Sequence, residues 1–98
     1  MPKRLPPIHL GEHLKEFMED FSLTANQLAK ALHVPANRVT AIVNGTRGIT
    51  GETALRLGRY FGTSAEMWVN MQGHYDLEIA RDEFEAALLK EIQPRAAA

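Results

Sequence analysis

The amino-acid sequence predicts an all-α protein of five or six helices, and three features of its pattern support this fold class. No segment of useful length alternates apolar and polar residues as a half-buried strand does. Apolar residues instead recur every three or four positions, which is the spacing of an amphipathic helix. Proline, glycine and hydroxyl-bearing residues separate these stretches at the places where helices begin and end.

Helices in the first half of the chain are expected at residues 11–20, 24–31 and 35–44. Prolines make residues 1–10 an extended arm that precedes them. Thr24 and Gln27 have the spacing of a capping box, in which each side chain bonds a backbone N–H at the helix start. Pro35 suits the first position of the third helix, and Gly45 can adopt the left-handed conformation that ends it.

Helical structure in the second half is expected at residues 51–61 and within a C-terminal segment at 64–92. Thr50 precedes the first of these helices and Gly62 follows it, as caps at its two ends. Thr63 and Glu66 have the spacing of a second capping box. Gly73 would weaken the C-terminal segment and could divide it, which is why five or six helices are expected.

The composition is that of one globular domain, with 98 residues, 45% hydrophobic and 23% charged. This domain is expected over residues 11–92, and the tail at 93–98 is expected to be disordered. The absence of cysteine excludes disulfides, thiolate zinc sites and thiol nucleophiles. No apolar run reaches the roughly 20 residues of a membrane span, and the basic start lacks the apolar stretch of a secretory signal. A cytoplasmic protein is expected.

Charge is distributed unevenly along the chain. Residues 1–62 carry eight Lys and Arg against five Asp and Glu, whereas residues 63–98 carry three against seven. Within residues 24–62 the balance is five basic residues against one acidic residue. This asymmetry predicts a basic and an acidic surface for two kinds of partner.

Residues 24–44 meet the size requirements of a helix-turn-helix, in which two short helices pack across a tight turn. Ala29 is small where the second helix would cross it. The apolar seam of the pair is provided by Leu28, Val39 and Ile42. His33 occupies the turn position that favours glycine, and its left-handed conformation is expected to cost about 1 kcal/mol.

The exposed face of the third helix carries side chains that suit DNA. Asn37 can pair with adenine, and the Thr40 methyl can contact thymine. Arg38, at the edge of this face, can pair with guanine or phosphate. Small residues that allow close approach to the groove are Ala36 and Ala41. Residues placed for phosphate contacts are Asn26, Thr46 and Arg47. A single polar residue is more often merely solvated, but this cluster in a basic segment favours DNA binding.

Longer motifs make the sequence similar to a known family. They lie at residues 8–12 (IHLGE), 34–39 (VPANRV), 42–50 (IVNGTRGIT), 53–72 (TALRLGRYFGTSAEMWVNMQ) and 75–77 (YDL). Over this stretch the chain resembles the HigA-type (VapI-like) addiction-module antitoxins, which belong to the repressor-like helix-turn-helix proteins. Two departures are Leu10, where the family usually has proline, and His33, where it usually has glycine.

The resemblance implies a lambda-repressor-like DNA-binding domain that acts as a homodimer. Such a protein binds operator DNA in the major groove at its own operon and neutralises a RelE/HigB-like toxin, an mRNA endonuclease. Two toxin-binding surfaces remain open: the acidic segment after Thr63, and the N-terminal arm with the first helix. The alternatives are a repressor without a toxin, and a toxin-binding module without DNA specificity.

Large apolar residues late in the sequence predict a dimer interface. The expected interface residues are Trp68, Val69, Tyr75 and Phe84. A helix-turn-helix protein usually needs two half-sites about 34 Å apart, which favours this interpretation. The alternative for Trp68 and Met71 is simple core packing, since both recur at helical spacing with Tyr75 and Ile79.

No cluster predicts catalysis, a cofactor or a metal site. His9 and His13 are four residues apart, but no further ligand is evident. The neighbours His74, Tyr75 and Asp76 would point in different directions on a helix. The sequence contains no glycine-rich phosphate loop and no nucleophile with an oriented base, so no enzymatic activity is expected.

Overall fold

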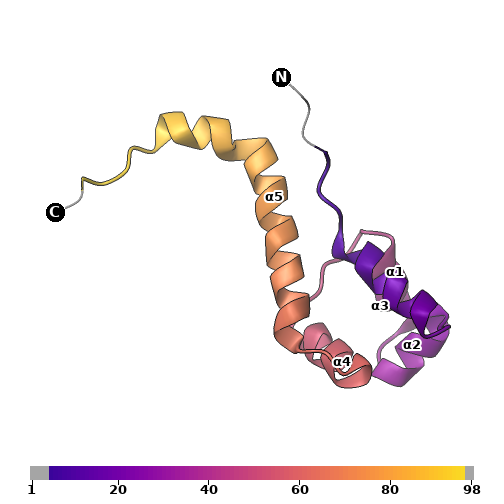
Figure 1. Cartoon of the computed structure of the whole chain (residues 1–98). Coiled ribbons are helices and arrows are strands. Elements are labelled where there is room, and N and C mark those ends of the chain that lie inside the picture. Colours follow the sequence, from indigo (N-terminus) through magenta and orange to yellow (C-terminus); the bar gives the residue numbers. More distant parts are fainter. Residues whose placement is uncertain (1–4, 97–98) are drawn as a thin grey trace.

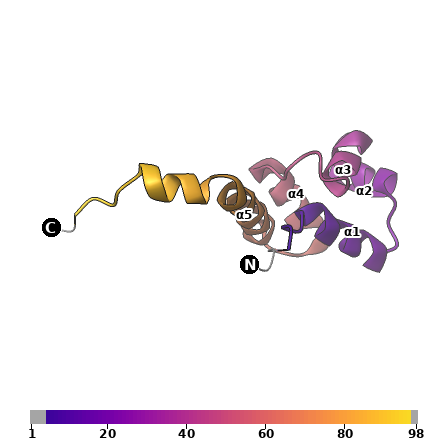
Figure 2. The ribbon, with the colours of Figure 1, turned by 90° about the horizontal axis from the view of Figure 1, so that it is seen from above.

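The computed structural model describes residues 5–96, which form five α-helices and, within that range, no strand (Figure 1). The helices are α1 (Leu10–Asp20), α2 (Ala25–Leu32), α3 (Ala36–Val43), α4 (Gly51–Phe61) and α5 (Ala65–Glu91). The all-α prediction is therefore confirmed. Helices α1 to α4 and the beginning of α5 form one body, and the rest of α5 extends away from it (Figures 1 and 2).

One apolar core lies inside this body, and every helix contributes to it. Its largest fully buried side chains are Leu10, Leu14, Leu28, Val39, Ile42, Leu57 and Trp68. The predicted seam of the helix-turn-helix is part of this core, because Leu28, Val39 and Ile42 are each at most 1% exposed. Ala29 is 2% exposed, as its small size at the helix crossing predicted.

Local capping begins and ends the middle helices as the sequence predicted. Thr24 Oγ1 accepts a hydrogen bond from the Gln27 backbone N–H at 3.1 Å, and Gln27 Oε1 accepts one from the Thr24 N–H at 2.9 Å. Thr50 caps α4 through its side-chain oxygen. Gly45 and Gly62 follow α3 and α4 with left-handed φ angles of 80° and 74°.

The boundaries of α1 and α3 differ slightly from the predicted ones. Leu10 belongs to α1 and not to the arm, because the His9 side chain caps the helix by accepting from the Gly11 N–H at 2.9 Å. Leu10 therefore stands at the first helical position, where proline is also tolerated. Pro35 lies one residue outside α3, as its N-cap, and Asn44 is the C-cap.

The start of α5 corrects the predicted capping box. Ser64, and not Thr63, is the N-cap, and its side chain accepts from the Met67 N–H at 3.1 Å. The Thr63 hydroxyl oxygen instead accepts a hydrogen bond from Trp68 Nε1 at 2.9 Å. This bond satisfies the polar atom of an indole ring that is otherwise completely buried.

Helix α5 is continuous over 27 residues, so Gly73 does not divide it. Figure 1 shows the helix changing direction in its second half, where the ribbon turns from orange to yellow. Every residue from 81 to 91 is exposed. Among residues 5–96, no helix combines the length and the apolar character that crossing a membrane requires.

The predicted arm and tail are only partly covered by the structure. Residues 5–9 and 92–96 are neither helix nor strand. The remaining parts of the predicted arm and tail, residues 1–4 and 97–98, lie outside the described residues.

The backbones of α1 and α3 approach each other closely at Gly11. A β-carbon added at this position would overlap the carbonyl oxygen of Ile42. Because that carbonyl belongs to the backbone of a packed helix, it cannot move aside as a flexible side chain could. Glycine at this position therefore sets how closely α3 lies against α1.

Gly11→Ala is expected to destabilise the protein by about 1–3 kcal/mol, because the added methyl group overpacks this crossing. The free energy of unfolding in urea measures the effect. Gly73→Ala is the matched control, since its β-carbon would meet nothing within 4 Å. That substitution should stabilise α5 by roughly 0.5–1 kcal/mol. Equal stability of the Gly11→Ala and wild-type proteins would contradict the close crossing.

Candidate nucleic-acid interface

The turn between α2 and α3 has the geometry that the helix-turn-helix prediction required. His33 adopts the left-handed conformation, with φ 58° and ψ 45°. Its backbone N–H donates to the Lys30 carbonyl at 3.2 Å, and the N–H of Val34 donates to the Ala29 carbonyl at 3.0 Å. The turn therefore forms with histidine in place of glycine.

One face of α3 is open to solvent. Ala36, Asn37 and Thr40 are exposed there, and Ala41 lies half-buried at the edge. The Thr40 hydroxyl donates to the Ala36 carbonyl at 3.0 Å, so part of its hydrogen-bonding capacity is used within the helix. Asn44 was not predicted as part of this face, although it is exposed one turn after Thr40. The helical spacing of positions 37, 40 and 44 is the signal that indicates it.

The loop after α3 holds the two residues that were predicted to contact phosphate there. Thr46 donates its hydroxyl to the Ala41 carbonyl at 3.1 Å, and Arg47 is exposed beside it. The far end of the loop is tied to α5, because Gln72 Oε1 accepts from the Ile49 N–H at 2.6 Å. The loop is therefore anchored at both ends, which fixes its path next to α3.

Asn26 is exposed in the first turn of α2, two residues after the capping Thr24. The capping box occupies only some of the backbone N–H groups that a helix start leaves free. A helix N-terminus with free N–H groups and a positive dipole end is suited to an anion such as a DNA phosphate.

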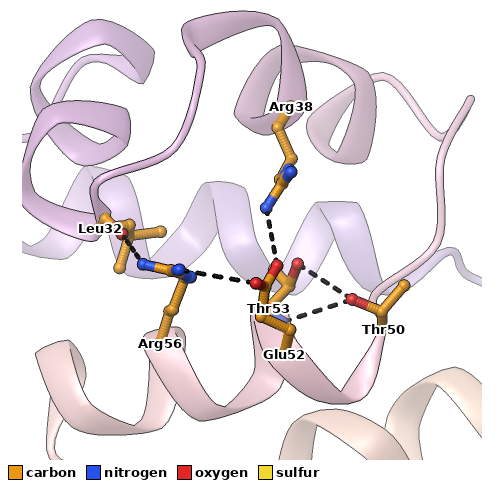
Figure 3. A network of polar contacts seen from close by, with 6 residues as sticks. All are labelled: Leu32, Arg38, Thr50, Glu52, Thr53 and Arg56. Atoms are coloured by element: carbon orange, nitrogen blue, oxygen red, sulfur yellow. Dashed lines mark hydrogen bonds and ion pairs between the residues drawn. The ribbon is translucent and has the colours of Figure 1, made fainter.

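Arg38 lies at the edge of this face, and its side chain is directed toward α4. Its side chain is 22% exposed, and its Nη1 donates to Glu52 Oε1 of α4 at 3.1 Å (Figure 3). The physical reason is the helical turn, which directs consecutive side chains about 100° apart. In this structure Arg38 therefore braces α3 against α4.

Glu52 and Arg56 were not predicted as part of this region. Glu52 Oε2 lies 3.5 Å from Arg56 Nη2, and Arg56 Nη1 donates to the Leu32 carbonyl at the end of α2 at 2.9 Å (Figure 3). The spacing of four residues indicates the Glu52–Arg56 pair from sequence. No local pattern indicates the bond from Arg38, which crosses between helices.

Two of the four expected dimer residues face the body of the chain. Trp68 is 0% exposed, with its ring 5.2 Å from that of Phe17, so no surface is left for a partner. Tyr75 is half-buried and places its ring edge-on to His9 at 4.8 Å. Val69 and Phe84 are 45% and 54% exposed. The expected interface therefore mixed two faces of one helix: Trp68 is inaccessible, Tyr75 is partly accessible, and Val69 and Phe84 are exposed.

One of the histidines near the N-terminus has a structural role. His9 Nδ1 is occupied by the Gly11 N–H, as the cap of α1. Over the described part of the chain, no group of three or more His, Cys, Asp or Glu side chains is arranged to hold a metal ion.

Together the packed pair α2–α3 and the open face of α3 define a helix-turn-helix protein. The sequence matches the helix-turn-helix family over residues 14–68. It is 51% identical to virulence-associated protein I of Dichelobacter nodosus over 80 residues, which are 81% of this chain and 74% of that protein.

Two solved structures extend the comparison. An addiction module antidote protein of the HigA family from Coxiella burnetii is 48% identical, with a TM-score of 0.87 over 93% of this chain and 100% of the other. The Pseudomonas aeruginosa antitoxin HigA, solved with the higBA promoter, is 44% identical, with a TM-score of 0.89 over 92% and 99%.

The chain belongs to the HigA-type antitoxins of the repressor-like helix-turn-helix family, as its motifs predicted. Members of this family are DNA-binding regulators and antitoxins without enzymatic activity, which confirms that the chain is not an enzyme.

Proposed function

We propose that this protein is a cytoplasmic antitoxin that binds the operator of its own operon as a homodimer, represses that operon, and neutralises a RelE/HigB-like mRNA endonuclease. The observation that carries the DNA-binding part is the open face of α3, where Asn37 and Thr40 are exposed on a helix-turn-helix. The P. aeruginosa relative was solved with promoter DNA, which supports the same activity here.

Each residue that we propose to contact DNA has a defined role in binding. Asn37 and Thr40 meet base edges in the major groove, and the small side chains beside them let α3 approach the groove floor. Asn26, Thr46 and Arg47 contact phosphates and fix the register of α3. The segment from residue 24 to residue 62 carries five basic residues against one acidic residue, which favours the polyanion.

The dimer in this proposal forms through the outer half of α5. Leu77, Phe84 and Leu88 lie seven and four positions apart, on one helical face, and are 50%, 54% and 44% exposed. A shallow hollow on this face is lined by Leu77, Ala80, Arg81, Glu85 and Leu88. Val69 extends the accessible apolar surface toward the body.

A second copy of the chain is the occupant that fits this face. Two DNA-reading helices must be held one helical turn of DNA apart, and a two-fold pairing of projecting helices supplies such symmetry. The ion pair of Arg81 Nε and Glu85 Oε2 at 3.5 Å places both signs of charge on the face, so a symmetric copy can complement it.

The toxin partner in this proposal binds the acidic part of the chain. Residues 63–98 carry seven acidic residues against three basic residues, a charge that complements a basic ribonuclease. The alternative toxin surface is the arm with α1, whose residues 5–9 run next to α5 (Figure 1).

Asn37→Ala is expected to weaken operator binding by about 1–3 kcal/mol, or roughly 5- to 150-fold, because it removes a bidentate contact to a base. Titration of labelled DNA from upstream of the operon measures this, with scrambled DNA beside it. The wild-type protein should prefer the operator by at least about 10³-fold. Asn70→Ala, at an exposed asparagine of α5, should change nothing. Equally weak wild-type binding to both DNAs would refute the sequence-specific function.

Leu88→Glu is expected to convert the dimer into a monomer, because a carboxylate would be buried against the partner helix. Sedimentation equilibrium measures the oligomeric state. Leu89→Glu is the matched control, since Leu89 is 72% exposed and lies outside the row of Leu77, Phe84 and Leu88. A dimer that survives Leu88→Glu and dissociates with Leu89→Glu would place the interface elsewhere.

A basic protein encoded beside this chain is expected to co-purify with it and to stop cleaving mRNA when bound. Glu83→Lys in α5 should weaken that complex, whereas Glu16→Lys in α1 should not, because only the first reverses charge on the proposed toxin surface. Both side chains are exposed, so folding is unaffected. Operator binding without any such partner would show a repressor that acts alone.

A further inference from the structure

A small polar network links the DNA-reading helix to α4 and to the end of α2. Glu52 is its centre, with Arg38 Nη1 at 3.1 Å on one carboxylate oxygen and Arg56 Nη2 at 3.5 Å on the other (Figure 3). Arg56 also donates to the Leu32 carbonyl at 2.9 Å. One carboxylate therefore holds two guanidinium groups from two different helices.

The network leaves some of its hydrogen-bonding capacity unused. The Nε atoms of Arg38 and Arg56 are both buried and have no hydrogen-bond partner. A buried donor without an acceptor is unfavourable relative to the same donor in water. Both arginines pair with Glu52, whose side chain is itself 61% exposed.

Arg38 is next in sequence to Asn37, so a long cationic side chain begins at the edge of the DNA-reading face. Any cation that reaches a phosphate strengthens binding to every DNA sequence alike, because phosphates carry no sequence information. In this structure Arg38 is directed at α4 instead, and only 22% of its side chain is exposed.

We propose that Glu52 is a positioning residue that limits non-specific DNA binding by holding Arg38 against α4. The inference rests on the proposed DNA-binding function and adds to it a determinant of specificity. By holding Arg38, Glu52 keeps one cation per protomer away from the DNA phosphates. The base contacts of α3 then contribute a larger share of the binding free energy.

The position of the Arg38 side chain depends on the negative charge of Glu52. Arg38 and Arg56 approach the same carboxylate, so without its charge two cations would face each other across a short distance. Arg56 is still retained by the Leu32 carbonyl, whereas the only hydrogen bond of the Arg38 guanidinium in the described structure is to Glu52. Arg38 is therefore the side chain that moves outward.

The test is the salt dependence of binding to scrambled DNA, which needs no knowledge of the operator. Each phosphate contact adds about −0.9 to the slope of log K against log salt concentration. Glu52→Gln is expected to steepen the slope by about 0.9 per protomer, so that each protomer contributes a further fall in affinity of about 3.5-fold between roughly 50 and 200 mM salt. The preference for operator over scrambled DNA should fall at the same time.

Two control variants separate release of Arg38 from a general change of charge. Glu66→Gln makes the same change at the same position of α5, the second residue after the N-cap, and should leave the slope unchanged. Arg38→Gln should also leave the wild-type slope unchanged, because Arg38 is held away from DNA. In the Arg38→Gln background, Glu52→Gln should no longer steepen the slope.

Three results would overturn the inference: an unchanged slope for Glu52→Gln, the same steepening with Arg38 absent, or a shallower slope for Arg38→Gln alone. Thermal unfolding followed by circular dichroism verifies that each variant is folded. If Glu52→Gln does not fold, the single Arg38→Gln variant still decides whether Arg38 contacts phosphate in the wild-type protein. Failure of the wild-type protein to prefer its operator would instead refute the proposed function, and the slopes on scrambled DNA would still be comparable.

Discussion

The close packing of α3 against two other helices is the constraint on which the rest of the structure depends. At Gly11 the backbone of α1 lies directly against the Ile42 carbonyl, and the small residue Ala29 is buried in α2, which packs against α3. Because these contacts contain no long, flexible side chains, α3 has little freedom to shift relative to α1 and α2. The outer face, with Asn37 and Thr40, is presented in one orientation as a consequence.

Trp68 connects this DNA-reading body to α5. Its ring lies in the core near Phe17, and its Nε1–H donates to Thr63, so the first turns of α5 cannot rotate without breaking both contacts. Gln72, one turn further, bonds the loop that carries Thr46 and Arg47. The base of α5 thus supports the loop that we propose to contact phosphate and also sets the direction of the projecting half, so the two proposed surfaces share one rigid support.

Features that depend on neighbouring residues were predictable from the sequence, and features that depend on distant residues were not. The capping box at Thr24 and the left-handed turn at His33 follow from short-range chemistry and are confirmed. At the start of α5, Thr63 and Ser64 are equally good caps in sequence, and only the buried Trp68 indole decides between them. Likewise, the place of Arg38 depends on Glu52, fourteen positions away on another helix.

The exposed outer half of α5 has a consequence for how folding and assembly are coupled. Every residue from 81 to 91 is exposed and none belongs to the apolar core, so this segment is not stabilised by core packing. A helix of such length is marginal in water by itself, since its formation is opposed by backbone entropy. Local helix–coil opening there is independent of the stability of the body. In the proposed dimer, part of the ordering of α5 would therefore occur on association, and the protein concentration would govern how much of its C-terminal segment is helical.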